Sequence, residues 1–251
     1  MAQEHQAAEI KVAADNAALN LMVVEEFCRC AKATIAVRNR FCVALSGGNT
    51  PRAVYSLLVT KRDLLPWDKI YIFFGDERHV PPEHSDSNYR MASEAFLSRV
   101  PLPQKNIYRV HAELDAKVAA QEYEEQLREF FQLQDIRLQN NDWPQFDLVL
   151  LGLGDDGHTA SLFPGSLALA ENTRMVVANW VKKFNEYRIT LTFPVLNQAA
   201  EVMFLVSGES KAEILRNVLN LDQTNTYPAQ RVQPVNGRLL WFLDQPAARL
   251  L

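Results

Sequence analysis

The sequence predicts an α/β fold, with a largely parallel open sheet and helices on both of its faces. Short apolar runs alternate along the chain with longer segments of helical periodicity, a pattern typical of parallel sheets. The 251 residues are 48% hydrophobic and 22% charged, so the chain can bury a sizeable core. No internal repeat is present. We therefore expect a single domain over residues 1–251.

In the first part of the chain, helices and strands follow one another closely. Residues 17–37 carry apolar side chains at helical spacing, and the apolar run FCVAL at 41–45 predicts a buried strand. A helix is expected from Pro51 onward, because the fixed φ angle of proline suits the first helical turn. The run KIYIFF at 69–74 predicts the next strand.

The remainder of the chain continues this alternation. Beyond a loop rich in Pro, Asp and Ser, helices are expected at 88–99 and 115–133, with the short run NIYRV between them. The further strands are expected at 147–151, 174–180, 187–193 and 201–207, and the last is followed by a helix through Leu219. The polar segment 132–145 is predicted as a surface loop rather than a domain boundary.

Charge and cysteine content exclude several classes of function. A net charge of −4 and a pI near 5.8 disfavour binding to nucleic acid or to an anionic membrane surface. Cys28, Cys30 and Cys42 are odd in number and predict neither a disulfide framework nor a metal site. The N-terminus lacks signal-peptide features, and no apolar run approaches the roughly 18 residues of a membrane span. We expect a soluble cytoplasmic protein that is a monomer or a weak oligomer.

One turn combines glycines with acid/base side chains. Gly152, Gly154 and Gly157 follow an apolar strand with the spacing of a dinucleotide-binding fingerprint. That fingerprint brings a pyrophosphate onto bare backbone amides, whereas Asp155 and Asp156 would repel the phosphates here. His158 follows directly. A carboxylate and an imidazole two residues apart at a strand end indicate acid/base chemistry, so Asp156 and His158 are candidate catalytic residues.

A second turn has the composition of an anion site. The glycines of Ser46-Gly47-Gly48-Asn49-Thr50 let backbone amides converge before the helix expected at Pro51, and the two hydroxyl groups can add hydrogen bonds. The turn is not a Walker loop, because Gly-Lys-Ser/Thr is missing. A tight strand-to-helix connection with Thr50 as N-cap remains an equal alternative at this point.

Two cations stand at the ends of predicted elements. Lys211 lies early in the helix after strand 201–207, where a cation is unfavourable against the helix dipole unless an anion binds. Arg188 opens an otherwise apolar strand. An exposed lysine and a surface salt bridge are the alternatives for these two residues.

The loop GDERHVPPEHSDSNY at 75–89 carries the densest charge. His79 and His84 stand near carboxylates, but the loop fixes no ligand pair and no further cluster completes a tetrahedral metal site. We therefore expect no metal. Arg78 beside a carboxylate pair at a strand end is the better functional candidate, and a loop salt bridge is its alternative.

Five segments together resemble the 6-phosphogluconolactonases of the glucosamine-6-phosphate isomerase/6-phosphogluconolactonase family. They are ALSGGNTP, FFGDERHVPPEHSDSNYRMA, DLVLLGLGDDGHTASLFPG, YRITLTFPVLNQA, and YPAQRV followed by LLWFLD. The resemblance runs from about residue 10 to the C-terminus. It implies a sugar-phosphate-isomerase-like, Rossmann-like fold and hydrolysis of 6-phospho-D-glucono-1,5-lactone in the oxidative pentose phosphate pathway. It implies no metal or organic cofactor.

The resemblance also implies roles for particular residues. The proposed base of the family falls on His158, the preceding aspartate on Asp156, and the arginine of Gly-Asp-Glu-Arg on Arg78. Phosphate contacts fall on the 46–50 turn, Arg188 and Lys211. These residue types suit lactone opening, which needs a deprotonated water, a stabilised oxyanion and a proton for the leaving ring oxygen.

Three other functions share part of this sequence pattern. Glucosamine-6-phosphate deaminases are similar in fold and in the Asp-Gly-His turn, but their pattern continues His-Ile-Ala-Phe-Asn-Glu-Pro. This chain instead has HTASLFP from His158 and lacks Asn-Glu. A non-enzymatic sugar-phosphate-sensing domain would carry a helix-turn-helix in front, and the roughly 40 residues before the first strong strand are too few and not basic. An NAD-dependent oxidoreductase is disfavoured by Asp155 and Asp156.

Overall fold

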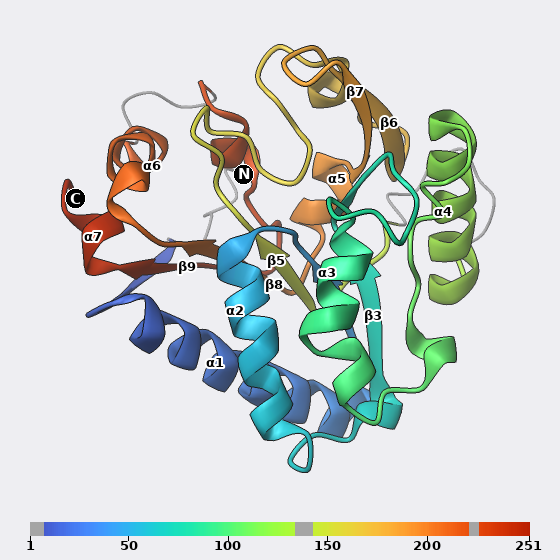
Figure 1. Ribbon diagram of the computed structural model, residues 1–251, viewed down its shortest axis with the longest axis horizontal. Coiled ribbons are helices and arrows are strands. Elements are labelled where there is room, and N and C mark those ends of the chain that lie inside the picture. Colours follow the sequence, from blue (N-terminus) through green and yellow to red (C-terminus); the bar gives the residue numbers. More distant parts are fainter. Residues whose placement is uncertain (1–7, 134–142, 221–225) are drawn as a thin grey trace.

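Six parallel strands form the central sheet, in the order β1-β9-β8-β5-β2-β3 (Figure 1). This computed structural model describes residues 8–133, 143–220 and 226–251, so most of the loop predicted at 132–145 lies outside the described residues. The strands are β1 (Glu9–Ala13), β2 (Phe41–Leu45), β3 (Ile70–Phe74), β5 (Leu148–Leu151), β8 (Glu201–Val206) and β9 (Arg238–Asp244). The predicted α/β class with a largely parallel sheet is confirmed.

Helices cover both faces of this sheet. Successive side chains of each strand point to opposite faces, so the sheet has a separate hydrophobic core on each side. Val43 of β2 points into one core and its neighbour Ala44 into the other. The first core is covered by α1 (Asn16–Arg38), α2 (Asn49–Leu58) and α3 (Asn88–Ala95). The second is covered by α4 (Ala116–Phe131), α5 (Phe193–Asn197), α6 (Ala212–Leu219) and α7 (Gln245–Ala248). No described helix is both long and apolar enough to cross a membrane.

A second sheet is antiparallel and has the strand order β4-β7-β6. Its strands are β4 (Asp76–Arg78), β6 (Val176–Val181) and β7 (Glu186–Leu191). Strands 174–180 and 187–193 were expected in the largely parallel sheet and 76–78 in a loop, and both predictions are wrong. The four residues between β6 and β7 are too few for the crossover that parallel strands require, so these strands pair as a hairpin.

Several other elements differ from the expectation. β1 and β9 were not predicted as strands, and α5 begins where strand 187–193 was expected to end. The segment NIYRV forms only a single bridge, between Ile107 and Ile72. α2 begins at Asn49 with Gly48 as its N-cap, so Thr50 lies inside the helix and its alternative role as N-cap is wrong. Short 3₁₀ helices complete the described chain at Val59–Lys61, Trp67–Lys69, Leu97–Arg99, Gln104–Asn106, Leu167–Ala170, Glu209–Lys211 and Pro228–Arg231.

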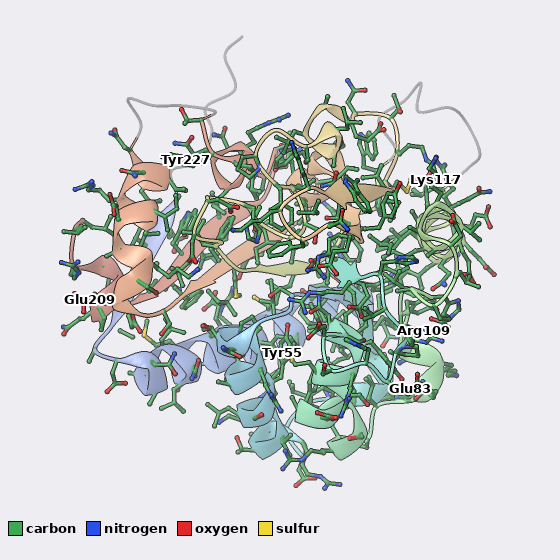
Figure 2. All side chains as sticks on the ribbon, turned by 45° about the horizontal axis from the view of Figure 1, so that its top comes forward. Tyr55, Glu83, Arg109, Lys117, Glu209 and Tyr227 are labelled. Atoms are coloured by element: carbon green, nitrogen blue, oxygen red, sulfur yellow. The ribbon has the colours of Figure 1, made fainter. Side chains whose placement is uncertain are left out.

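Two buried tyrosines hold the carboxyl ends of neighbouring strands. The hydroxyl of Tyr55 on α2 (Figure 2) accepts a hydrogen bond from the backbone N–H of Ser46 at 3.0 Å and donates to its carbonyl at 2.9 Å. Tyr123 on α4 makes the same two bonds with Phe74, at 2.8 and 3.0 Å. Burial raises the pKa of both phenols, so they keep the protons that these bonds need. The chain segments that leave β2 and β3 therefore start from fixed positions.

Candidate active site

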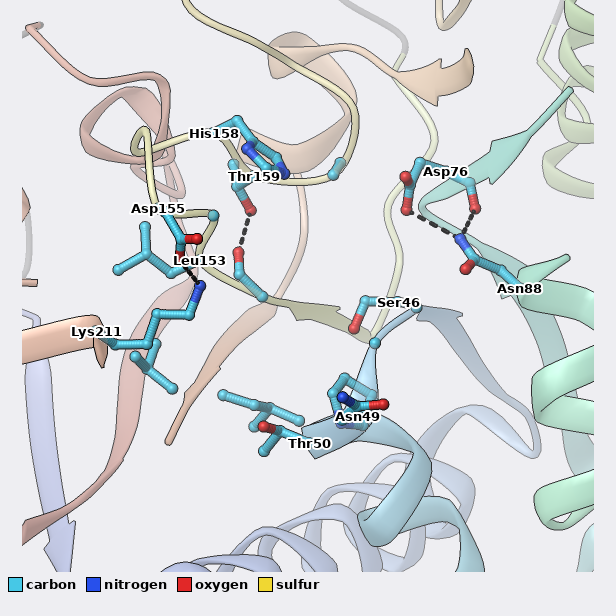
Figure 3. A pocket seen from close by; sticks show the side chains of 18 of the residues that line it. Ser46, Asn49, Thr50, Asp76, Asn88, Leu153, Asp155, His158, Thr159 and Lys211 are labelled. Carbon is cyan, nitrogen blue, oxygen red and sulfur yellow. Dashed lines mark hydrogen bonds and ion pairs between the residues drawn. The ribbon is translucent and has the colours of Figure 1, made fainter. Parts of the chain in front are cut away.

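A cavity of about 470 Å³ opens where the turns after β2, β5 and β8 meet the second sheet (Figure 3). This is the edge at which open parallel sheets bind ligands. The predicted site residues that line the cavity are Ser46, Gly47, Gly48, Asn49, Thr50, Arg78, His158 and Lys211. Asp156 contacts His158 from beside the cavity, and Arg188 does not line it.

His158 and Asp156 form a close pair. The imidazole Nδ1 lies 2.5 Å from Asp156 Oδ1, and the backbone N–H of His158 donates to the same oxygen at 3.2 Å. Burial opposes ionisation of Asp156, but the hydrogen bonds to His158 and the charges of His158 and Lys183 outweigh it and lower the pKa of the carboxyl group. The resulting carboxylate holds a proton on Nδ1, which leaves Nε2 as the basic nitrogen.

The turn that carries this pair closes on itself after β5. Gly154 N–H donates to the carbonyl of His158 at 2.9 Å, and Gly157 N–H donates to the carbonyl of Gly154 at 3.0 Å. Gly157 has a φ of 76°, which glycine adopts without strain. No α-helix follows this turn before β6, whereas a dinucleotide fingerprint needs a helix N-terminus there. The spacing of glycines alone was therefore misleading.

Arg78 is fixed by the segment between β4 and α3. Its Nη1 donates to the carbonyl of Asp86 at 2.5 Å. The adjacent Glu77 is buried, and its carboxylate accepts hydrogen bonds from the backbone N–H groups of Arg78, Asn88 and Tyr89 and from the hydroxyl of Ser87. Burial raises the pKa of Glu77 in spite of these bonds. Glu77 thus ties β4 to the start of α3 and directs its neighbour Arg78 toward the cavity.

The 46–50 turn places a helix N-terminus and an unsatisfied hydroxyl at the cavity. Gly48 has a φ of 105° and makes no side-chain cap, so the first amides of α2 have no capping side chain. Ser46 is 5% exposed, and its Oγ has no hydrogen-bond partner among the described residues. A Cβ on Gly47 would fall 2.0 Å from the side-chain oxygen of Asn88, so glycine is required for this packing.

Lys211 lies at the N-terminus of α6 and lines the cavity. Its ammonium is 2.5 Å from Asp155 Oδ1, and Figure 3 shows this ion pair. The hydrogen bond from Lys211 lowers the pKa of Asp155, whose side chain is 78% exposed. The lysine is therefore held at the cavity by a carboxylate that water can solvate readily.

Arg188 lies next to the cavity rather than in it. It stands opposite Arg78 in the β4–β7 pairing, and its guanidinium is 2.5 Å from Glu186. Its Nη1 is buried and has no hydrogen-bond partner among the described residues. Burial, and then the charge of Arg78, lower its pKa. Its assignment as a phosphate ligand stays a prediction.

The cavity is also lined by residues that were not predicted as site residues, among them Asp76, Asn88, Lys183 and Phe184. Asp76 is 8% exposed and accepts a 2.6 Å hydrogen bond from Ser161. Lys183 and Phe184 come from the turn between β6 and β7, and Lys183 lies 3.6 Å from Asp156. Asp76 lies in the charged segment 75–89, which the sequence marks as a candidate. Nothing local in the sequence predicts that the turn between β6 and β7 reaches the cavity.

The two histidines considered as metal ligands have separate partners. A ring nitrogen of His79 lies 2.7 Å from the carbonyl of Leu114, and His84 Nδ1 accepts a hydrogen bond from the backbone N–H of Asp86. Elsewhere, Glu26, Cys30 and Glu201 have ligand atoms within 4.8 Å of one another, but Arg29 and Arg238 are paired with both carboxylates. Independence from metals stays a prediction.

Comparison with known proteins agrees with the fold and identifies the family. Residues 14–241 match the family model described as glucosamine-6-phosphate isomerases/6-phosphogluconolactonase. A 6-phosphogluconolactonase of Synechocystis sp. is 45% identical over 86% of this chain and 87% of its own. One of Nostoc sp. is 42% identical over 85% of both chains.

Solved structures show the same similarity. The 6-phosphogluconolactonase from Trypanosoma cruzi superposes with a TM-score of 0.86 at 29% identity over 99% of both chains. That from Trypanosoma brucei gives 0.85 at 29% identity over 98% of this chain and 99% of its own. A monomeric glucosamine-6-phosphate deaminase, at 18% identity and a TM-score of 0.79, shares the fold. The chain belongs to the glucosamine-6-phosphate isomerase/6-phosphogluconolactonase family.

Proposed function

We propose that this protein hydrolyses 6-phospho-D-glucono-1,5-lactone to 6-phospho-D-gluconate in the oxidative pentose phosphate pathway. The observation that carries the proposal is the His158–Asp156 pair, whose imidazole lines the same cavity as the uncapped N-terminus of α2. One end of the cavity thus supplies a base and another supplies donors for a phosphate. Relatives with 42–45% identity carry the name of this enzyme.

His158 acts as the general base in this mechanism. Nε2 removes a proton from a water molecule as the oxygen attacks C1 of the lactone, and the carbonyl becomes a tetrahedral oxyanion. The oxyanion then collapses, the bond from C1 to the ring oxygen breaks, and the imidazolium returns its proton to that oxygen. Asp156 keeps the Nδ1–H tautomer and stabilises the imidazolium. Arg78 faces the negative charge or the sugar hydroxyls.

The phosphate is assigned to the part of the cavity between α2 and α6. The amides of the 46–50 turn and the hydroxyl of Ser46 supply donors, and Lys211 supplies a positive charge. Lys211 would exchange its Asp155 partner for the phosphate. Arg188 adds positive potential from the adjacent strand.

The function is tested by following hydrolysis of freshly generated phosphorylated lactone above the spontaneous rate, with glucosamine 6-phosphate assayed in parallel. We expect turnover of the lactone and no deamination, because the chain lacks Asn-Glu after the His158 turn. His158→Asn should lower kcat by about 10²- to 10⁴-fold, the usual contribution of a general base. A folded variant with near wild-type kcat would remove His158 from this role.

Compartment and assembly are also proposals. We propose a cytoplasmic enzyme that acts as a monomer or weak oligomer on a small-molecule substrate, without nucleic acid or membrane partners. One relative at 39% identity is named as chloroplastic, so fractionation of the source cells is the relevant measurement for compartment. Sedimentation at two protein concentrations tests the assembly state.

A further inference from the structure

The imidazole of His158 is stacked on an aromatic side chain from its own loop. The ring centroids of His158 and Phe163 are 4.0 Å apart, and the ring planes are inclined by 27°. Phe163 is 7% exposed, yet neither of the two hydrophobic cores includes it. Among the described residues, Phe163 also makes a T-shaped contact with Phe184, with ring centroids 5.8 Å apart. This buried ring is therefore stacked on the candidate base.

The same imidazole also packs against a glycine. A Cβ built on Gly154 would fall 2.0 Å from both Nδ1 and Cε1 of His158, closer than any side chain can lie. Glycine at this position lets the ring approach the backbone. Phe163 therefore contacts one face of the His158 ring, and Asp156 and Gly154 contact its Nδ1 edge. Among the described residues, Nε2 makes no hydrogen bond, and His158 lines the cavity.

We propose that Phe163 is a positioning residue that fixes the plane of the His158 imidazole, with Gly154 providing the space for it. The inference rests on the proposed role of His158 as base. The base nitrogen must lie about 2.6–3.2 Å from the oxygen whose proton it removes, and a shift of about 1 Å in a reacting group can lower a rate about 100-fold. Asp156 fixes one ring atom, but a hydrogen bond at one atom still allows the ring to swing. The stack removes that freedom, and its π face also stabilises the imidazolium formed during water attack.

The test compares Phe163→Leu, which removes the π face, with Phe163→Tyr, which retains it. We expect Phe163→Leu to lower kcat for the phosphorylated lactone by about 10- to 100-fold, with KM within about twofold of wild type, because the phosphate contacts are untouched. Phe163→Tyr should restore kcat to within a few-fold of wild type. Phe96→Leu removes a buried ring from the core that α1, α2 and α3 cover. It is the matched control and should keep wild-type kinetics.

A second measurement reports the stack without activity. In protein with isotopically labelled histidine, the ring C–H signals of His158 are identified by their loss in His158→Asn. The ring current of Phe163 should shift them upfield in wild type and in Phe163→Tyr, and Phe163→Leu should abolish the shift. If the leucine variant does not fold, Phe163→Met takes its place, because it fills similar volume without a π face.

The positioning role of Phe163 and the proposed function are contradicted by different results. Wild-type kcat in folded Phe163→Leu, or an unchanged chemical shift, overturns the positioning role. An equal loss of kcat in Phe96→Leu overturns it as well. Wild-type protein that does not hydrolyse the lactone above background overturns the proposed function, whereas the chemical shifts still decide whether the stack orients His158.

Discussion

At the scale of single residues, the cavity contains a buried hydroxyl group without a partner among the described residues and a lysine whose carboxylate partner is exposed. Ser46 Oγ is buried and unpartnered among the described side chains, and a buried hydroxyl in that state costs about 1–3 kcal/mol. Lys211 is paired with Asp155, which is 78% exposed and loses little by returning to water. A phosphate dianion would satisfy the hydroxyl and replace the carboxylate at the lysine.

Lys211→Met should therefore discriminate between two substrates. A charge-assisted contact is worth about 1.5–3 kcal/mol, so kcat/KM for the phosphorylated lactone should fall by about 10- to 100-fold. The value for unphosphorylated gluconolactone should change by less than about threefold. Arg216→Met, which removes an exposed cation of α6 outside the cavity, is the control. Steady-state kinetics with both lactones gives the answer, and equal losses on the two would remove Lys211 from the phosphate site.

A pH-dependent contribution to stability follows from Asp156. Its pKa is lower in the folded protein than its ordinary value, because the hydrogen bonds to His158 and the nearby positive charges outweigh the effect of burial. The stabilisation is therefore complete above the ordinary pKa of about 4 and is lost as pH falls through the lowered pKa. The free energy of unfolding of wild type should exceed that of Asp156→Asn at pH 7, and the difference should shrink toward about pH 3. Urea titrations at several pH values measure it; a difference independent of pH would contradict the assignment.

At the scale of elements, the site depends on where strands end. Ser46, directly after β2, and Phe74, the last residue of β3, have backbone groups bonded to Tyr55 and Tyr123, from helices on opposite faces of the sheet. Strand ends carry backbone groups that the sheet no longer pairs, and a loop leaving such an end is otherwise free to move. The two hydroxyls satisfy these groups and so define where the 46–50 turn and β4 begin.

Tyr55→Phe tests whether the hydroxyl of Tyr55 fixes the position of the 46–50 turn. It leaves the N–H and carbonyl of Ser46 without their buried partner, so we expect a loss of about 1–3 kcal/mol in the free energy of unfolding. The variant should also raise KM for the phosphorylated lactone, because the displaced turn carries the phosphate donors. Tyr108→Phe is the control, since its hydroxyl has no hydrogen bond among the described residues. Denaturant titrations and steady-state kinetics are measured on both variants. Equal free energies of unfolding would contradict a role of the Tyr55 hydroxyl in fixing the turn.

The sequence predicted the strands that feed the cavity, because β2, β3, β5 and β8 are apolar runs followed by polar turns. It did not predict the second sheet. β4 consists of three charged residues without any apolar period, and its pairing with β7 is set by contacts more than 100 residues apart in sequence. For the same reason, Lys183 and Phe184 could not be recognised as cavity residues. Their role depends on the hairpin reaching across the strand ends.

At the scale of the whole molecule, the two ends of the parallel sheet differ in chemistry. The carboxyl ends hold the cavity. The amino ends of β1, β8 and β9 carry Glu9, Glu201 and Arg238, which form a network of ion pairs with α1. Arg238 lies 2.9 Å from Glu201, whose side chain is 8% exposed, and the Cys30 thiol donates to the same carboxylate at 3.1 Å. Burial, and then the charge of Glu201, raise the pKa of Cys30 and keep it a neutral donor. This end therefore serves stability.

The ion pairs at the amino ends of the strands should contribute to stability and not to catalysis. In Arg238→Met, Glu201 keeps its ion pair with Arg29, at 3.2 Å, and its hydrogen bond from Cys30. Removing one partner of a buried ion pair costs about 3–5 kcal/mol, and the remaining arginine should reduce this to about 2–4 kcal/mol. Arg249→Met is the matched control, because it breaks only an exposed pair with Glu209, worth about 0–1 kcal/mol. Below the unfolding transition, Arg238→Met should keep wild-type kcat and KM, since no atom of this network lines the cavity. Changed kinetic constants in the folded variant would show that the two ends of the sheet are coupled, whereas a loss of stability no larger than that of Arg249→Met would show that the network contributes no more than surface charges do.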